Sequence, residues 1–400
     1  MNISITIGYY LVFICLGMVM GALGPTLPFL AQNTGTSVSA ISVLFMARSF
    51  GYLVGSFQGG RLLDRFAGHP LMMGALFLLG LTQLFIPLIS WLGLLVICIF
   101  IMGLTAAMID VGGNTLIVWL HREKVGPYFN GLHFFWGVGA FFSPIIIVQL
   151  IPKNNGLISA YWILAGLTLP GIIWLGFLKS PKVEFHSDRD TAEKKPIYHV
   201  VLILIMLLFF LYVGVEVGFG GWIFTYTITL QLATEKSAAI LTSFFWAALT
   251  TGRLITIPLA IRFSPSRLLM GNYSGCLVAL GIILIGTNSI HLLWVGTILL
   301  GLGMAAIFPT LLSLAQQFLP ASGKITRWFF ISASFGGMTI PWSIGQFFDI
   351  CGPQITMMIL LVDVSCASLI FAGLIIYTRK LTTVNLQLRV PGNCTNLKKI

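Results

Sequence analysis

Hydrophobic residues occupy this chain in long uninterrupted stretches, with short polar segments between them. Each stretch has about 20 residues or more, the length that a helix needs to cross about 30 Å of hydrocarbon. The pattern predicts twelve transmembrane helices, at residues 5–30, 39–59, 70–90, 92–120, 128–151, 156–178, 198–229, 237–262, 267–286, 291–317, 324–348 and 353–378. The sequence therefore predicts an all-α integral membrane protein, with nothing left over for a soluble domain.

Composition supports this class. Hydrophobic residues make up 57% of the 400 residues and charged residues 8%, which leaves too little polar surface to cover a soluble protein. The six cysteines indicate no disulfide framework. Phosphate-binding loops, metal-ligand clusters and catalytic serine or cysteine motifs are absent from the sequence. We therefore expect neither an enzyme nor a resident metal or cofactor, apart from sodium or a proton as a coupling ion.

The net charge of +11 is unevenly distributed over the predicted loops. If the N-terminus is cytoplasmic, every cytoplasmic loop contains lysine or arginine, whereas the opposite loops contain only Lys153 and Lys236. This asymmetry predicts that both termini are cytoplasmic. The positive charge then reflects topology in a lipid bilayer, with the cell membrane as the expected location, and not binding to nucleic acid.

A charged linker divides the predicted helices into two groups of six. We expect an N-terminal six-helix bundle at 1–178, a cytoplasmic linker at 179–197, a C-terminal six-helix bundle at 198–378 and a cytoplasmic tail at 379–400. Two pseudo-symmetric bundles of this kind are typical of secondary transporters. A protein of this design is expected to function as a monomer.

The loop after the second predicted helix reads GGRLLDRFAGHP. Gly60, Asp64 and Arg65 match the signature G-x-x-x-D-[RK]-x-G of this loop in transporters of the major facilitator superfamily, which the chain resembles; Ala67 replaces the last glycine. The resemblance implies a gating role, in which Asp64 caps the helix that starts near Lys324. The alternative is an ordinary solvated turn.

Three further segments, YVGVE, IDVGGN and FFWAALTTGR, resemble the sodium-dependent glucose transporter-like group and, more distantly, the fucose-proton symporters. The resemblance implies transport of a hexose-like sugar by alternating access, coupled to sodium or protons. Two alternatives stay open. One is a facilitator or exporter of another small polar or amphiphilic solute, and the other is a non-transporting sensor on the same fold.

Charged residues inside predicted helices are the first candidates for a site, because charge at membrane depth normally faces a partner or a wet cavity. Asp110 and Asn114 lie one turn apart on one helix face, and we expect them to bind the coupling ion. Glu216 is expected to contact substrate or to take part in coupling. The alternative to these functional roles is structural, because the predicted helices also contain arginines. Asp110 could form an ion pair with Arg48, and Glu216 could form one with Arg253.

Aromatic and polar residues near these acids complete the candidate site. The glycines that follow Glu216 are expected to weaken the seventh helix and to free backbone groups for a cavity. By resemblance to the fucose-type symporters, His133 and Trp136 occupy positions that contact sugar. The full set of expected substrate contacts is Glu216, His133, Trp136, Trp222, Tyr226, Trp246 and Gln346. The aromatic residues are also compatible with simple packing between helices, and Asp363 is expected to be structural.

Overall fold

The computed structural model describes residues 2–151, 153, 155–181, 198–320 and 323–388. Most of the predicted linker and the end of the predicted tail lie outside these residues. The N-terminal half contains α1 (Asn2–Thr34), α2 (Val38–Ile41), α3 (Val43–Leu63), α4 (Gly68–Phe85), η1 (Ile86–Leu88), α5 (Leu92–His121), η2 (Arg122–Lys124), α6 (Val125–Leu150), α7 (Gly156–Gly166) and α8 (Thr168–Gly176). The C-terminal half contains α9 (His199–Thr229), α10 (Glu235–Arg262), α11 (Pro265–Ile285), α12 (Ile290–Met304), α13 (Ile307–Phe318), α14 (Gly323–Cys351) and α15 (Ile355–Leu388).

The described helices agree with a twelve-helix membrane protein. Ten stretches of them are long and apolar enough to cross a membrane, and one of these, Leu92–Leu150, contains both α5 and α6. With the 29-residue α14, the described part of the chain reaches twelve crossings. Three crossings are interrupted, which the hydrophobic pattern did not predict: the second consists of α2 and α3, the sixth of α7 and α8, and the tenth of α12 and α13. The chain is a multi-pass membrane protein.

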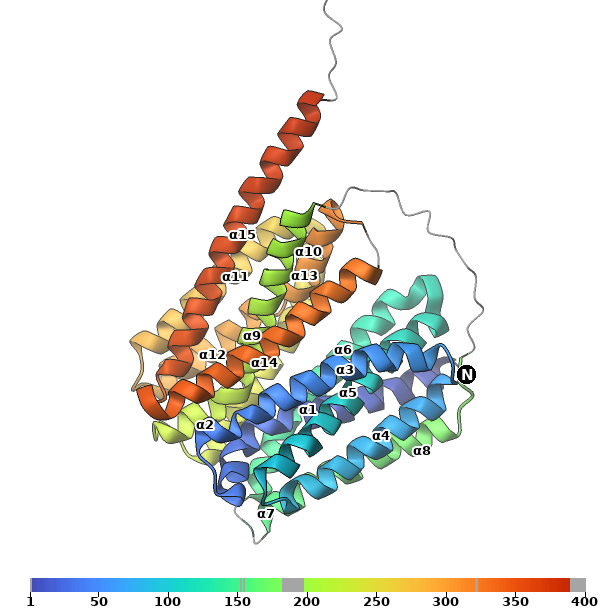
Figure 1. Ribbon diagram of the computed structural model, residues 1–400, viewed down its shortest axis with the longest axis vertical. Coiled ribbons are helices and arrows are strands. Elements are labelled where there is room, and N and C mark those ends of the chain that lie inside the picture. Colours follow the sequence, from blue (N-terminus) through green and yellow to red (C-terminus); the bar gives the residue numbers. More distant parts are fainter. Residues whose placement is uncertain (1, 152, 154, 182–197, 321–322, 389–400) are drawn as a thin grey trace, which may run out of the picture.

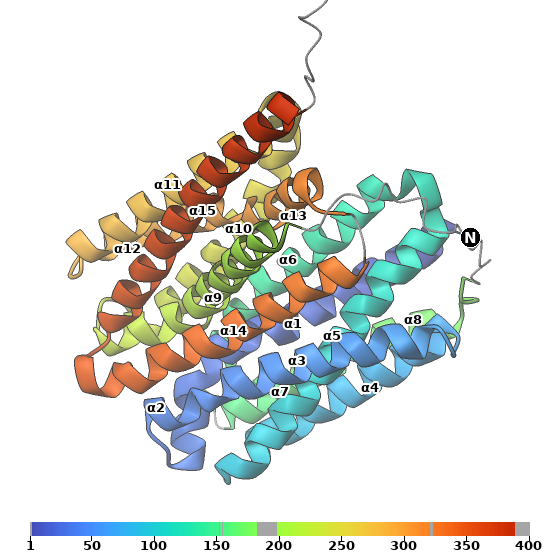
Figure 2. The same cartoon turned by 45° about the horizontal axis from the view of Figure 1, so that its top comes forward.

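The crossings gather into two bundles that lie side by side. Helices α1 to α8, blue to green in Figures 1 and 2, form one bundle, and α9 to α15, yellow-green to red, form the other. Between the bundles, α1 contacts α9, α3 contacts α14 and α6 contacts α10. The space enclosed by these three contacts is where a site shared by both bundles can lie.

Within the N-terminal bundle, glycines bring helix backbones into direct contact, as small residues do in membrane proteins generally. A methyl group on Gly55 of α3 would overlap the carbonyl group of Leu104 on α5, and one on Gly17 of α1 would overlap that of Trp136 on α6. The α3–α5 contact also sets the register of the two helices. In that register Arg48 is level with Gly103, and this placement determines which α3 side chain lies beside Asp110.

Helix α9 is continuous from His199 to Thr229, so the prediction that its glycines weaken it is wrong. The glycines make room for neighbouring rings instead. A methyl group on Gly220 would lie 2.5 Å from Cζ2 of Trp246, and one on Gly221 would lie 2.6 Å from Cε1 of Phe45. Neighbouring helices therefore occupy the space that a side chain would take.

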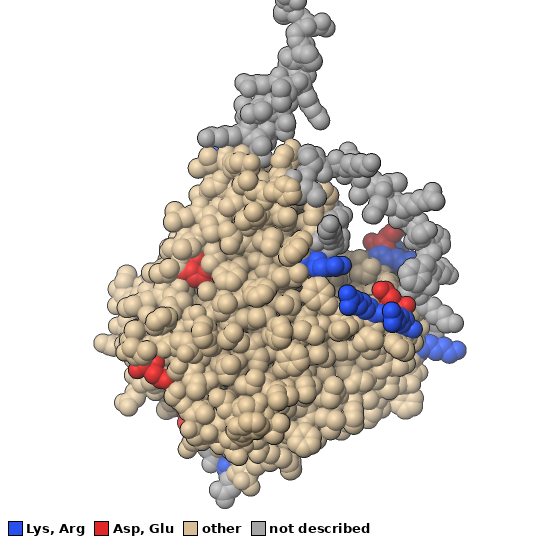
Figure 3. All heavy atoms as spheres, in the orientation of Figure 1, with Lys and Arg blue, Asp and Glu red and all other residues tan. Residues whose placement is uncertain are grey.

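The outer surface matches a membrane environment. Figure 3 shows a wide surface that contains no lysine or arginine and few acidic side chains, whereas most lysine and arginine side chains visible on this face gather at the end where the N-terminus lies. Large exposed hydrophobic side chains occur on helices of both bundles, among them Phe77, Ile97, Val278 and Leu369. These side chains face the region that lipid would fill.

Candidate functional site

A cavity of about 1210 Å³ lies between the two bundles. Helices α1, α3, α5 and α6 line it from one side, and α9, α10, α13 and α14 from the other. It extends to the helix ends at Arg61 and Asp64 of the N-terminal bundle and to Phe263 and Arg327 of the C-terminal bundle. The cavity therefore opens at the end of the molecule where the α3–α4 loop lies.

The opposite end is closed by contacts between α2 and α14. The backbone N–H of Ser39 donates to Oδ2 of Asp349 (2.9 Å), and Nε2 of Gln346 donates to the carbonyl of Ser39 (3.1 Å) and to Oγ of Ser42 (3.2 Å). Trp222 of α9 donates Nε1–H to the carbonyl of Pro341 (2.9 Å) within the C-terminal bundle, and its ring contacts Phe45 of α3 across the bundles, with centroids 5.8 Å apart. Solute can therefore enter the cavity from one side only in this conformation.

Between the cavity and the closed end, the backbones of α1 and α9 meet at glycines. A methyl group on Gly24 would lie 2.8 Å from the carbonyl oxygen of Gly220 and 3.0 Å from that of Gly221. All three glycines also line the cavity. This α1–α9 glycine crossing forms the innermost wall of the cavity.

On the wall of the N-terminal bundle, Asp110 is held by two hydrogen-bond donors. Tyr52 donates its hydroxyl proton to Oδ2, and Asn114 donates from Nδ2 to Oδ1 (3.0 Å). Sequence analysis missed Tyr52, although it lies four residues after Arg48 and hence on the same face of the predicted helix. The two donors fix the orientation of the carboxylate in the cavity wall.

The suggested ion pair between Asp110 and Arg48 is wrong. Nη1 of Arg48 donates to the carbonyl of Met20 (3.3 Å), and the guanidinium lies over the Phe45 ring, 5.6 Å from its centroid. Arg48 is level with Gly103, which precedes Asp110 by seven residues or about 10 Å along α5. That offset puts Tyr52 instead of Arg48 beside the carboxylate, and Arg48 has no carboxylate partner among the described residues.

On the wall of the C-terminal bundle, Glu216 and Arg253 form an ion pair. Nη2 of Arg253 lies 3.4 Å from Oε1 of Glu216, and their side chains are 26% and 15% exposed. The ion pair between Glu216 and Arg253, which the sequence suggested as a structural alternative, is thus present. Because both residues also line the cavity, pairing does not remove them from contact with a solute.

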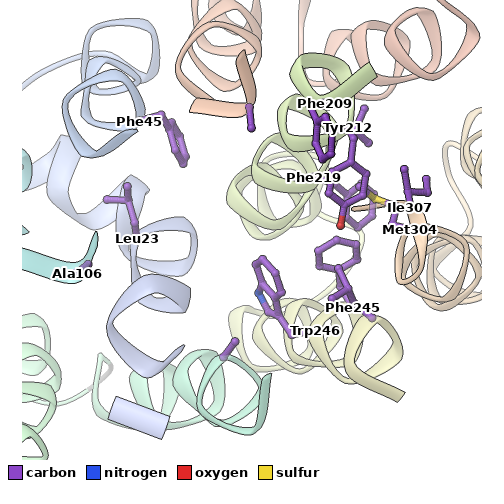
Figure 4. Packing of buried hydrophobic residues seen from close by; sticks show 14 of the residues in the cluster. Leu23, Phe45, Ala106, Phe209, Tyr212, Phe219, Phe245, Trp246, Met304 and Ile307 are labelled. Atoms are coloured by element: carbon purple, nitrogen blue, oxygen red, sulfur yellow. The ribbon is translucent and has the colours of Figure 1, made fainter. Parts of the chain in front are cut away.

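Aromatic residues complete the wall where the bundles meet. Trp136 of α6 and Trp246 of α10 form an edge-to-face contact across the boundary, with ring centroids 5.6 Å apart. In Figure 4, Trp246 points from α10 toward the N-terminal bundle, whereas Phe245 points into its own bundle. His133 packs against Phe129 with ring centroids 5.0 Å apart and also lines the cavity.

Three expected substrate contacts do not lie on the cavity wall. Trp222 follows Glu216 by six residues, which turns it about 240° around the helix axis, and both Trp222 and Tyr226 are fully buried. Gln346 belongs to the closed end. These placements correct the prediction: Trp222 and Tyr226 do share a face of α9, but it is not the face from which Glu216 lines the cavity.

The residues of the expected gate lie at the open end. Gly60 and Asp64 line the cavity mouth, while Arg65 is exposed and outside it. Among the described residues the Asp64 side chain has no hydrogen-bond partner, and Arg327 near the start of α14 lies over the Phe57 ring, 5.9 Å from its centroid. The cap of Asp64 on α14 is therefore not formed in this conformation and stays a prediction for the other one.

Comparison with solved structures places the fold. A D-xylose-proton symporter superposes with a TM-score of 0.75 at 14% identity, covering 92% of this chain and 97% of that one. The Escherichia coli fucose:proton symporter superposes with a TM-score of 0.62 at 18% identity, covering 93% and 99%. At these identities the likeness shows the fold alone.

Relatives found by sequence have a higher identity to this chain than these solved structures have. Sodium-dependent glucose transporter 1 of Xenopus laevis is 32% identical over 361 residues, which cover 82% of this chain and 72% of that protein. Sodium-dependent glucose transporter 1A of Mus musculus is 29% identical over 372 residues, covering 84% and 88%. The model of the Major Facilitator Superfamily matches residues 9–341. The chain belongs to the Major Facilitator Superfamily, whose members are transporters and not enzymes.

Proposed function

We propose that this protein transports a hexose-like sugar across the cell membrane by alternating access. The observation that carries the proposal is the cavity of about 1210 Å³, which is open at one end, closed at the other and lined by polar groups from both bundles. The names of the relatives, sodium-dependent glucose transporters that match over most of this chain, support a sugar as the solute.

The cavity wall supplies both kinds of contact that a sugar needs. Its hydroxyl groups require hydrogen-bond donors and acceptors, which Arg253, Glu216 and His133 provide. The apolar C–H face of a sugar packs on aromatic rings, and Trp136 with Trp246 offers such a surface where the bundles meet. Because these residues come from α6, α9 and α10, a bound sugar would contact both bundles at once and would respond to their relative movement.

The coupling ion in this proposal binds at Asp110. A hard cation requires several oxygen ligands, and Oδ1 of Asn114 is buried without a hydrogen-bond partner next to the Asp110 carboxylate. A sodium ion would bind to these oxygens in the cavity wall. A proton on Asp110 is the other form that the coupling can take.

The positions of the basic residues support one orientation of the protein in the membrane. Arg61 and Arg327 lie at the mouth of the cavity, on the same side as the basic loops, and positively charged loops favour the cytoplasm. In our proposal both termini are cytoplasmic and the conformation described here faces inward. The outward-facing conformation would form when the bundles rock, so that the mouth closes and the α2–α14 contacts separate. Since one chain encloses the whole cavity, we propose that the monomer is the working unit.

The test is solute flux into proteoliposomes that contain the purified protein. A panel of hexoses would be assayed under an imposed sodium gradient, under a proton gradient and without either. We expect saturable accumulation of at least one hexose that requires one of the gradients. Flux that equilibrates but never accumulates would indicate a facilitator, and absence of binding and flux for every sugar would refute the proposal.

A further inference from the structure

Arg48 is a buried cation near the closed end of the cavity, and no acid pairs with it. Its side chain is 7% exposed and lines the cavity, but no carboxylate among the described residues lies within ion-pair distance. Helix α3 runs from the closed end to the mouth, and Arg48 lies about 8 Å from the start of that helix. A charged side chain at membrane depth normally faces a partner or marks a path for a solute.

The guanidinium group of Arg48 is fixed in position while most of its donors stay unused. Its Nη1 donates to the carbonyl of Met20, and the group lies over the ring of Phe45, which holds its plane. Nε and Nη2 have no hydrogen-bond partner in the described structure, and protein atoms do not seal either nitrogen from the cavity. Arginine carries five N–H donors in a planar fork. The fork is therefore available to a ligand in a fixed orientation.

The contacts of Arg48 place this fork where the two bundles meet. Phe45 packs against the α1–α9 glycine crossing, where a methyl group on Gly221 would lie 2.6 Å from Cε1 of the ring, and in Figure 4 Phe45 points toward the other bundle. Ser49, the next residue of α3, donates to the carbonyl of Gly337 on α14 (3.0 Å). A ligand on Arg48 would therefore lie against both bundles.

The charges on the cavity wall balance only as long as the cavity is empty. Away from its mouth, the cavity is lined by two arginines, Arg48 and Arg253, and two acids, Asp110 and Glu216. Glu216 and Arg253 neutralise each other as an ion pair. Asp110 has neutral hydrogen-bond donors as its partners. In the proposed function it takes up sodium or a proton, and the charge of Arg48 is then left without a counter-charge.

We propose that Arg48 is an anion-binding site and that the solute of this transporter presents a carboxylate group to it. The planar fork of a guanidinium matches both oxygens of a carboxylate, and such pairs are stronger than neutral hydrogen bonds. The inference rests on the proposed sugar transport and narrows the solute to a sugar acid such as a hexuronate. The carboxylate would bind to Arg48, while hydroxyl groups of the sugar ring would bind to Glu216 and His133.

Charge balance would then couple the solute to the cation. With a cation at Asp110 and a carboxylate at Arg48, the net charge of the buried wall is zero, as it is in the empty cavity. Either ligand alone leaves one unit of charge. An unbalanced charge is most unfavourable in a closed cavity at membrane depth, through which the bundles pass when they change their facing. The empty and the doubly loaded protein would therefore change conformation more readily than the singly loaded one.

Equilibrium binding to the purified full-length protein tests the site without a transport assay. The probes are glucose with glucuronate and galactose with galacturonate, because the members of each pair differ only in the carboxylate that replaces a CH₂OH group. At a fixed sodium concentration and pH, we expect at least one uronate to bind about tenfold or more tightly than its neutral sugar, as a charged hydrogen-bonded pair provides. Arg48→Gln should remove this preference. Arg48→Lys, which keeps the charge but not the fork, should keep only part of it.

Arg61→Gln is the matched control. Arg61 is an exposed arginine of the same helix that lines the same cavity at its mouth. Its replacement removes the same charge, but water and salt screen that position from the closed end. The preference for the uronate should therefore change by less than about twofold.

Equal binding of uronate and neutral sugar to the unmodified protein would overturn the inference, and so would an unchanged preference in Arg48→Gln. The first comparison needs no variant, so it decides even if Arg48→Gln fails to fold. Chloride is tested alone as the other source of an anion. If chloride raises the melting temperature of the unmodified protein as much as the uronate does, but not that of Arg48→Gln, the site binds a free anion and the sugar acid is overturned. Absence of binding by every sugar and every uronate would refute the proposed function as well, whereas equal binding refutes this inference alone.

Discussion

Arg253 is the residue whose removal gives the most informative test of the cavity wall. In Arg253→Ala, Glu216 loses its positive partner but remains in the cavity wall. At the observed separation of 3.4 Å, two unit charges attract by about 5 kcal/mol for an effective dielectric constant of about 20. Desolvation of both groups offsets much of this attraction, so the net effect must be smaller.

The loss of stability in Arg253→Ala depends on how deeply the ion pair is buried. Breaking a fully buried ion pair costs about 3 to 5 kcal/mol, whereas an exposed pair contributes about 0 to 1 kcal/mol. The two side chains are 26% and 15% exposed and face an open cavity, so they lie between these limits. We expect Arg253→Ala to lower the free energy of unfolding by about 1 to 2 kcal/mol and the melting temperature in detergent by about 2 to 4 °C.

A double-mutant cycle isolates the pair. Arg253→Ala, Glu216→Gln and the double variant would be compared by thermal unfolding, and we expect a coupling energy of about 1 to 2 kcal/mol. Arg262→Ala is the control, because Arg262 is an exposed arginine of the same helix and its replacement should change stability by less than about 0.5 kcal/mol. If the effects of the two single variants are additive, the pair does not stabilise the protein. Arg253 would then act only through contacts with the solute.

Three further variants test the proposed transport cycle. Asp110→Asn should abolish accumulation under an ion gradient but spare counterflow of sugar, and normal accumulation in this variant would exclude Asp110 as the coupling site. Asp64→Asn should lower transport at near-normal expression and shift the protein toward the inward-facing state, which accessibility of single cysteines at the two ends would report. Gln346→Ala removes three hydrogen bonds at the closed end, each contributing about 1 kcal/mol, and should favour opening of that end about tenfold or more. An unchanged ratio of the two states would show that the remaining contacts, among them the hydrogen bond from Ser39 to Asp349, keep this end closed without Gln346.

Much of the fold follows from hydrophobic runs alone, because the length of a membrane crossing is fixed by the bilayer. The predicted span 198–229 and the observed α9, His199–Thr229, differ by one residue at the start. The final helix is less well predicted, since α15 extends to Leu388, beyond the expected end at residue 378. Polar residues such as Thr382 and Asn385 follow that limit, and hydropathy carries no information about where a helix ends once it has left the membrane.

The site was harder to predict than the fold. Its composition depends on which face each helix turns toward the cavity and on how neighbouring helices are aligned along their axes. Asp110, Glu216 and Arg253 stand out by charge and do lie on the cavity wall. Trp222 was assigned by its residue type, yet its face of α9 meets the closed end. Tyr52 carries no charge, so nothing but its spacing from Arg48 marked it. A pairing such as Asp110 with Tyr52 depends on the glycine contacts between α3 and α5, which a single sequence does not reveal.

The α1–α9 glycine crossing has a consequence for how tightly the transporter holds back ions. At Gly24, Gly220 and Gly221 the barrier consists of backbone against backbone, and backbone atoms have no rotamers through which a barrier could loosen by degrees. The two helices must separate as whole bodies or remain closed. We therefore expect little leakage of ions or water while the cavity stands open on the other side, so that an idle transporter would not dissipate the ion gradient that the proposed coupling would use.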